Sequence, residues 1–306
     1  MQEVPGPPSF SSALLAVLLC GAFGANAVAI KMSLSGLGPF TAAGSRFLIA
    51  SMTIFIWARA TGRSIRVGRN QVFTLFIIWV LFSSQISLMY LGIHLTNASR
   101  ATLITNLQPF FVLFLAHLFI REERITPRKT MGLLLGFGGV CLVFLEEKGV
   151  GDQFRTGDIL IVLTTLLWAA NSVYTKKVIH IFSPYLVVLY PMLFSIPLFF
   201  VGGLLWDEPM VGDVNFKIAA ALLYQALVAA AFGFIAWNTL LRRHGAVALN
   251  SYNFLMPIAG VFCGWWLLGE PLTVKIWLAL ALVTAGIVVI QTKARGQMTE
   301  GSKGSS

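Results

Sequence analysis

Amide side chains are the groups in this sequence best suited to binding a small polar molecule. The candidates within long apolar runs include Asn26, Gln85, Asn106, Asn171 and Asn253. A buried amide costs free energy unless it is hydrogen-bonded, so we expect each one to face the protein interior. Such amides can bind the amino and carboxylate groups of a zwitterion without carrying a charge. Alternatively they join helices, where an interhelical hydrogen bond contributes about 0.6 kcal/mol.

Aromatic residues and one arginine add to this polar set. Trp168 and Trp237 lie within apolar runs, where each forms either the wall of a binding cavity or ordinary core, and Tyr252 lies close to Asn253. Arg46 lies roughly 10 Å from the nearer end of its run. Its guanidinium either pairs with a substrate carboxylate or extends to the membrane surface.

Two prolines interrupt apolar runs near their middle. Pro109 and Pro257 each remove a backbone donor and clash with the carbonyl four residues earlier. Carbonyl groups freed inside a membrane need partners or must face water. Each proline therefore marks either a plain kink or a helix break that lines a cavity and takes part in gating.

The elements that carry these residues are long enough to cross a bilayer. Of the 306 residues, 57% are hydrophobic and 11% charged, and the mean hydropathy is +0.80. Soluble domains carry about 25% charged residues, so a soluble enzyme, a disordered regulator and a disulfide scaffold are excluded. Because backbone groups must be hydrogen-bonded in hydrocarbon, we expect helices. The ten predicted spans lie near residues 10–32, 39–58, 71–92, 96–119, 127–145, 157–178, 184–206, 215–241, 246–268 and 273–292.

Loop charges predict the orientation of these spans. With the N-terminus inside, fifteen Lys and Arg residues fall on the cytoplasmic side and six on the outer side. Cytoplasmic loops are enriched in Lys and Arg, so we expect both termini in the cytoplasm. We expect residues 1–9 to form a cytoplasmic segment and residues 293–306 to form a disordered cytoplasmic tail. The net charge of +10 is explained by these loops, and we expect no nucleic-acid partner.

The chain repeats itself. At an offset of 145 residues Asn26 aligns with Asn171, and at an offset of 148 Pro109 aligns with Pro257. Each half holds five spans, and an odd number makes the second half enter the membrane from the opposite side. The predicted fold is an all-α membrane protein of ten transmembrane helices, arranged as two inverted five-helix repeats around a central cavity, residues 10–146 and 147–292. Inverted repeats are typical of transporters.

The ends of the two halves resemble a known family. The apolar run after Pro109 ends at Arg121-Glu122, and the run after Met256-Pro257 ends at Leu268-Gly269-Glu270-Pro271-Leu272-Thr273. This pattern resembles the EamA-type repeat of the drug/metabolite transporter superfamily, with Arg121 where glycine is usual. The stretches 167–171 and 236–238 resemble bacterial amino-acid exporters of that superfamily.

The resemblance covers about residues 10–292. It implies a basket of ten helices around a central cavity, and the export of amino acids and related metabolites. Members that favour aromatic amino acids carry aromatic residues just before the proline of the fourth helix, where this chain has Asn106-Leu107-Gln108. A strictly aromatic substrate is therefore not expected.

These features predict an exporter of amino acids and related small metabolites that works by alternating access in the bacterial inner membrane. An antiporter of phosphorylated metabolites or nucleotide sugars is the alternative, but phosphate would need several inward cations, and Arg46 is the one basic residue well inside a span. A membrane-embedded enzyme would need clustered catalytic His, Asp or Ser residues. We expect no enzyme activity, catalytic residue, metal or cofactor. The expected partners are a small-molecule substrate and the lipid bilayer, and the expected state is a monomer.

The acidic residues bear on the energy source. All twelve lie in loops, tails or the ends of spans. Proton-coupled transporters keep an ionisable carboxylate inside the membrane as a relay. We therefore expect no such carboxylate within the bundle, and transport without obligatory proton exchange.

Overall fold

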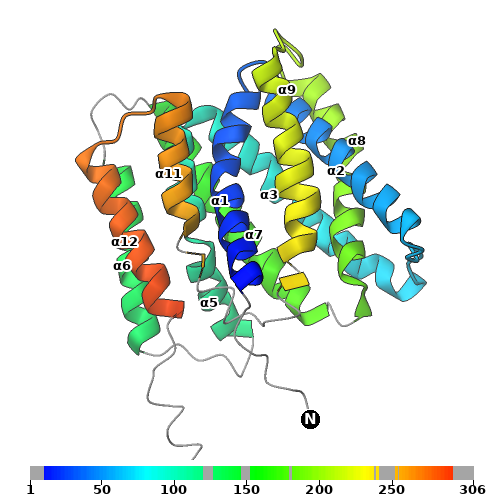
Figure 1. Cartoon of the computed structure of the whole chain (residues 1–306), viewed down its shortest axis with the longest axis horizontal. Helices are drawn as coiled ribbons and strands as arrows, with labels where there is room; N and C mark the ends of the chain where they lie inside the picture. The colour runs from blue at the N-terminus through cyan, green and yellow to red at the C-terminus, as the bar shows by residue number, and fades with distance from the viewer. Residues whose placement is uncertain are drawn as a thin grey trace, which may run out of the picture.

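Helices make up the folded part of the protein (Figure 1). The computed structural model describes residues 10–119, 127–145, 152–178, 181–237, 239–240, 252–253 and 255–291. Within these ranges no β-strand forms, and Leu37 and Val211 make one isolated bridge. The first half comprises α1 (Phe10–Ser33), α2 (Pro39–Ala60), η1 (Arg69–Gln71), α3 (Val72–Leu95), α4 (Ala98–Thr105), α5 (Gln108–Phe119) and α6 (Pro127–Phe144). The second half comprises α7 (Asp152–Val178), α8 (Pro184–Trp206), α9 (Phe216–Leu223), η3 (Tyr224–Phe232), α11 (Leu255–Leu268) and α12 (Val274–Gln291).

The lengths of the helices fit a membrane protein. Six described helical stretches are long and apolar enough to cross a bilayer: Phe10–Ser33, Pro39–Ala60, Arg69–Leu95, Arg155–Thr175, Tyr185–Trp206 and Phe216–Trp237. Three more apolar helices are shorter: Thr130–Val143, Leu255–Leu268 and Val274–Val289. The prediction of an all-helical membrane protein is confirmed. The count of ten crossings stays a prediction, because the shorter helices and the divided fourth span do not reach that length.

The most extensive helix contacts join the two halves of the chain. Helix α6 lies against α12, α3 against α7, α1 against α11, and α2 against α8, and Figure 1 shows α6 beside α12 and α1 beside α11. Helix α5 also contacts α7. In the sequence repeat, α1 corresponds to α7, and α5 corresponds to α11. The contact of α1 with α11 therefore has its counterpart in the contact of α7 with α5. This pair of contacts is what the repeat in the sequence predicts, and the inverted arrangement of the halves stays a prediction.

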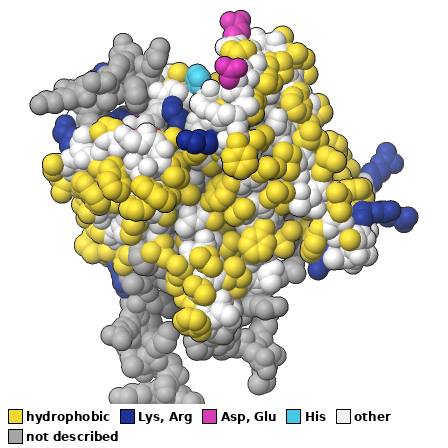
Figure 2. Space-filling model, turned by 45° about the horizontal axis from the view of Figure 1, so that its top comes forward, with side chains coloured by type: hydrophobic (Ala, Val, Ile, Leu, Met, Phe, Trp, Pro, Cys, Tyr) yellow, Lys and Arg dark blue, Asp and Glu magenta, His cyan; other side chains and the backbone are white. Residues whose placement is uncertain are grey.

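The two ends of the bundle differ in charge. We name as the carboxylate end the one where α1, α3 and α8 finish and where α2, α4 and α7 begin, at the top of Figure 1. It holds every Asp and Glu of the described residues: Asp152, Asp158, Asp207, Glu208, Asp213 and Glu270. The opposite end carries Arg59, Arg63, Arg66 and Arg69 between α2 and α3, and we name it the arginine end. Apolar side chains cover much of the surface between the two ends (Figure 2).

The fourth span is broken where the sequence predicts it. Helix α4 ends at Thr105, and α5 starts at Gln108, so that Pro109 lies in the first turn of α5. Proline is well tolerated there, because the first turn of a helix has no intrahelical acceptor for its backbone nitrogen. Pro257 likewise lies in the first turn of α11, whereas residues 241–251 fall outside the described residues.

The eighth span contains a feature that the sequence does not predict. Residues Tyr224–Phe232 form a π-helix instead of an α-helix. Gln225, at its start, donates its amide hydrogens to the Ala29 carbonyl oxygen at 2.9 Å and to Ser33 Oγ at 3.1 Å. These bonds tie the π-helix to α1. No glycine or proline marks this segment in the sequence.

Small residues let α11 approach α1 and α4. A Cβ atom added at Gly260 would lie 2.2 Å from Thr102 Cγ2 and 2.8 Å from the Gly24 carbonyl oxygen. We expect Gly260→Val to force these helices apart and to destabilise the protein by about 1–3 kcal/mol, the usual cost of overpacking. Thermal denaturation of the purified protein measures this effect. A Cβ at Gly138 meets nothing within 4 Å, so Gly138→Ala is the control. A G260V variant that melts like the wild type would contradict the close contact.

Candidate substrate site and its closure

The break in the fourth span lies against α7. Gln108 Nε2 donates to Ser172 Oγ at 3.3 Å, and Ser172 Oγ donates to the Trp168 carbonyl oxygen at 2.8 Å. Asn106 caps the end of α4, and its Nδ2 donates to the Thr102 carbonyl oxygen at 2.8 Å. The fold therefore places the Asn106–Gln108 break beside the Trp168–Ser172 segment, although about 60 residues separate them in the sequence.

The described side-chain hydrogen bonds of Asn106 and Asn171 lie within single helices. Asn171 Oδ1 accepts a hydrogen bond from Thr175 Oγ1 of the same helix at 3.4 Å, and Asn106 likewise bonds within α4. Asn26 is half-buried in α1, and its Oδ1 has no hydrogen-bond partner among the described residues. Gln85 is buried in α3, and its Oε1 is also without a partner there. These groups retain hydrogen-bonding capacity that a ligand can use.

Several candidate residues lie at similar depths. With a rise of 1.5 Å per residue, Asn26, Arg46 and Asn106 lie roughly 10–12 Å along their helices from the carboxylate end. Gln85 lies roughly 15 Å from it, counted from Leu95, and Trp168 lies roughly 15 Å along α7 from Asp158, which pairs with Arg100 in the first turn of α4. The backbone carbonyl of Gln85 accepts a hydrogen bond from Thr164 Oγ1 of α7 at 3.4 Å, which places α3 beside the same helix as Trp168.

Trp237 and Tyr252 belong to a different cluster. Both lie against Ala16, Leu19 and Leu240, and the Trp237 ring meets the Phe23 ring edge-on with centroids 6.0 Å apart. Asn253 follows directly and accepts a hydrogen bond on its carbonyl oxygen from the Met256 amide at 3.1 Å.

Arg46 is buried within the bundle. Only 5% of its surface is exposed, and its guanidinium carbon lies 5.0 Å from the centre of the Phe47 ring. Its Nη1 donates to the Tyr90 hydroxyl at 3.5 Å, and its Nε has no partner among the described residues. The Tyr90 hydroxyl donates to Gln225 Oε1 at 2.7 Å. A chain of hydrogen bonds thus joins α2 and α3 to the π-helix, and in the described ranges no carboxylate pairs with Arg46.

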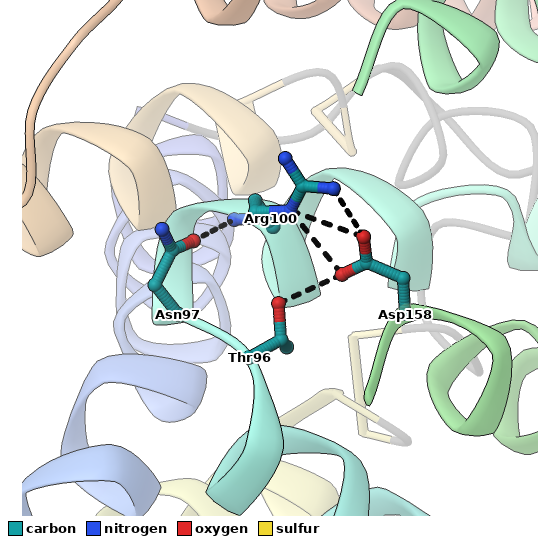
Figure 3. Close-up of polar contacts among 4 residues, drawn as sticks. All are labelled: Thr96, Asn97, Arg100 and Asp158. Carbon is teal, nitrogen blue, oxygen red and sulfur yellow. Dashed lines mark hydrogen bonds and ion pairs between the residues drawn. The ribbon is translucent and has the colours of Figure 1, made fainter. Parts of the chain in front are cut away.

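A buried ion pair closes the carboxylate end. Arg100 of α4 is 1% exposed and pairs with Asp158 of α7, which is fully buried (Figure 3). Arg100 Nε lies 3.1 Å from Asp158 Oδ2, and Thr96 Oγ1 donates to Asp158 Oδ1 at 2.7 Å. Asn97 Oδ1 accepts from the Arg100 amide at 3.0 Å and so caps α4. The pair therefore joins one half of the protein to the other.

Two more carboxylates bind helix N-termini across the halves. Glu270 accepts hydrogen bonds from the Ala98 and Ser99 amides of α4 at 2.6 and 2.8 Å. Asp207 accepts from the Thr41 amide of α2 at 2.7 Å and from the Thr41 hydroxyl at 2.8 Å. A carboxylate at a helix N-terminus is stabilised by the orphan amides and by the helix dipole. Each of these acids comes from the second half and each helix from the first.

Lys31 completes this end of the bundle. Its Nζ donates to the carbonyl oxygens of Ile93, His94 and Thr96 at 2.8, 2.9 and 2.5 Å. It therefore holds the C-terminus of α3 against α1, where cations are favoured. The described residues contain no group of three or more His, Cys, Asp or Glu side chains that could hold a metal ion.

The expectation that no carboxylate lies within the bundle needs correction. Asp158 and Glu270 do lie near the ends of helices, as the sequence indicates, but the fold buries both. Their partners are 58 and 171 residues away in the sequence, so no local pattern reveals them. Sequence reasoning also missed Tyr90 and Gln225. The only signal for them was a polar side chain within an apolar run.

Comparison with known proteins agrees with this fold. The chain is 29% identical over 288 residues to the "Probable amino-acid metabolite efflux pump" of Escherichia coli (strain K12), covering 90% of this chain and 93% of that protein. It is 22% identical over 268 residues to the "Uncharacterized transporter YoaV" of Bacillus subtilis (strain 168), covering 85% and 89%. A crystal structure superposes with a TM-score of 0.67 at 17% identity, covering 97% of this chain and all of that one, which shows a shared fold.

The family profile accounts for nearly the whole chain. The profile of the EamA-like transporter family matches twice, over residues 10–145 and over residues 155–292. These two matches confirm the duplication inferred from the sequence repeat. The chain belongs to the EamA-like transporter family.

Proposed function

We propose that this membrane transporter exports amino acids and related small metabolites by alternating access between two inverted halves. The observation that carries the proposal is the break at Asn106–Gln108 lying against Trp168–Ser172 of α7. Interrupted helices at the interface of two repeats are where such transporters bind substrate. The name of the Escherichia coli relative, "Probable amino-acid metabolite efflux pump", supports the same substrate class.

The chemistry of the site suits a zwitterion. Asn106, Asn171, Asn26 and Gln85 offer amide donors and acceptors for the amino and carboxylate groups, and the Trp168 ring offers an apolar wall. The buried guanidinium of Arg46, with its unused Nε, supplies the positive charge for one carboxylate. The cluster of Trp237, Tyr252 and Asn253 forms a second wall in this proposal.

The alternative is an antiporter of phosphorylated metabolites. A phosphate carries more charge than a carboxylate and would need several inward cations. Among the described residues, the buried Arg100 is paired with Asp158, and the amine of the partly buried Lys31 is bound to three carbonyl oxygens. Arg46 alone of these three has no such partner. This distribution favours a substrate with one carboxylate.

A substrate panel in liposomes tests the proposed site. We expect Asn106→Ala, Asn171→Ala and Trp168→Ala to lower amino-acid transport from a few-fold to about a hundredfold, because each loses about 0.5–3 kcal/mol of substrate contact. The exposed Asn70→Ala is the matched control. The contrary result would be that all three variants are less stable but transport at the wild-type rate per folded molecule. That result would contradict the proposed site and would favour a substrate site at Trp237 and Tyr252.

The proposed topology places the arginine end and both termini in the cytoplasm. This orientation rests on the excess of Lys and Arg residues on that side of the membrane. In a variant without native cysteines, we expect R63C to react with a membrane-impermeant maleimide only after the cells are permeabilised, and D213C to react in intact cells. Labelling of R63C from outside would overturn the orientation. In that case the carboxylate end would face the cytoplasm.

A further inference from the structure

A hollow lined by arginines lies between α2 and α3 at the arginine end. It has a volume of about 330 Å³. The residues that line it are Arg59, Gly62, Arg63, Ser64, Ile65 and Arg66. Gly62 takes a φ of +66°, which lets the chain turn away from the end of α2. Three arginine residues therefore line one hollow.

The second half of the chain holds this loop in place. The Tyr185 hydroxyl donates to the Ser64 carbonyl oxygen, and the Tyr190 hydroxyl donates to the Ile65 carbonyl oxygen at 2.6 Å. Gln71 donates its amide hydrogen to the Ile181 carbonyl oxygen. Because these contacts come from α8 and the segment before it, the cavity is shaped before any ligand binds. Binding to a preformed site costs less ordering entropy.

The cations of this cavity have no counter-ion in the described structure. Residues 10–119 contain no Asp or Glu, and the ion pair of the described residues, Arg100–Asp158, lies at the opposite end. The Arg63 guanidinium carbon lies 4.6 Å from the centre of the Trp57 ring and 5.8 Å from that of Tyr185. These cation–π contacts orient Arg63 without neutralising its charge.

The cavity lies at the level where lipid headgroups are expected. Apolar side chains are exposed on both sides of the loop: Phe55 and Ile56 near the end of α2, and Val72 and Phe73 at the start of α3, are between 43% and 72% exposed. These residues face lipid in a membrane protein. Figure 2 shows Lys and Arg side chains projecting at the edge of the molecule where Figure 1 places the end of α2.

We propose that the Arg59–Arg63–Arg66 cavity binds the phosphate group of an anionic phospholipid. Arginine binds phosphate oxygens through a planar set of donors, and several arginines around one cavity match a phosphodiester. The rule that cytoplasmic loops are basic explains why arginines occur in this loop, but it does not require them to line one hollow that is fixed by two tyrosines. The position beside lipid-facing residues favours a headgroup over a soluble anion.

Native mass spectrometry of the delipidated full chain in neutral detergent tests the proposal. Phosphatidylglycerol and phosphatidylcholine with identical acyl chains compete for the protein. We expect wild type to prefer phosphatidylglycerol, and R59Q/R66Q to bind it about tenfold more weakly or worse, as loss of charge-assisted contacts predicts. This variant keeps Arg63 and its aromatic contacts. The preference should also weaken as salt is raised.

A variant with the same change in net charge is the control. R69Q/K217Q alters one cation of the same loop that does not line the cavity, and one exposed cation at the carboxylate end. We expect it to retain the preference for phosphatidylglycerol. Equal losses in both variants, or no preference in wild type, would overturn the proposal. Sodium phosphate that bound alone as tightly as the lipid would make a soluble anion the occupant and would overturn it as well. Gel filtration of each variant confirms that it is folded.

Discussion

Replacing Asp158 with Asn is expected to destabilise the protein more than any other single change proposed for it. The variant would leave the Arg100 guanidinium buried beside a neutral amide, and breaking a buried ion pair from one side costs about 3–5 kcal/mol. For a chain of this size such a loss lowers the melting temperature by about 10 °C. Thermal denaturation in detergent measures it. Because the pair joins α4 to α7, a cysteine introduced at the carboxylate end should also react faster with a maleimide in this variant.

Two further variants identify the ion pair as the cause. Asp213 lies at the same end but is exposed, so Asp213→Asn should melt like the wild type. The double variant R100Q/D158N removes both charges, and we expect it to recover part of the lost stability, because no unpaired charge stays buried. If D158N melted normally yet abolished transport driven by an imposed pH gradient, Asp158 would be a proton relay rather than a clamp.

Replacing Arg46 with Gln should preserve the stability of the protein but lower its transport activity. A buried guanidinium without a carboxylate is costly to the fold, so the variant should be as stable as the wild type or more stable. Transport of substrates that carry a carboxylate should fall by about a hundredfold, as expected when a charged contact of about 3 kcal/mol is lost. Uptake into liposomes and thermal denaturation of the same preparation measure both effects.

The choice of substrate separates recognition from structure. Amines that lack the carboxylate cannot pair with Arg46, so the R46Q variant should transport them as well as the wild type does. Arg46→Lys keeps the charge but loses the planar set of donors, and we expect an intermediate loss. A drop in transport that is equal for amines and amino acids would show that Arg46 only supports the bundle through Tyr90.

The helical character of this protein could be predicted from its residue types. Long apolar runs had to be helices, because a chain in hydrocarbon must satisfy its own backbone hydrogen bonds. The break before Pro109 was predictable, since proline removes a donor and clashes with the preceding turn. The alignment of Asn26 with Asn171 revealed the duplication that the family match confirms.

Polar partners could not be predicted in the same way. Gln225 binds Ala29 and Ser33 from nearly 200 residues away, and it does so from a π-helix that no residue in the sequence marks. Tyr90 and Arg46 meet only because α2 and α3 pack together. The candidate residues Asn106 and Trp168 were named from sequence, but their proximity depends on the contact between Gln108 and Ser172.

The sequence by itself determined the helices, the broken fourth span, the repeated halves and the charge difference between the two ends. These depend on residue type and on spacing along the chain. The tertiary structure alone decided which charges are buried and what they bind. Asp158, Asp207 and Glu270 look like ordinary helix-end residues, and they become clamps because the other half of the protein brings an arginine or a helix N-terminus to them. Burial lowers the effective dielectric constant around these groups, so the loss of one partner, which costs little at a surface, becomes costly inside the bundle.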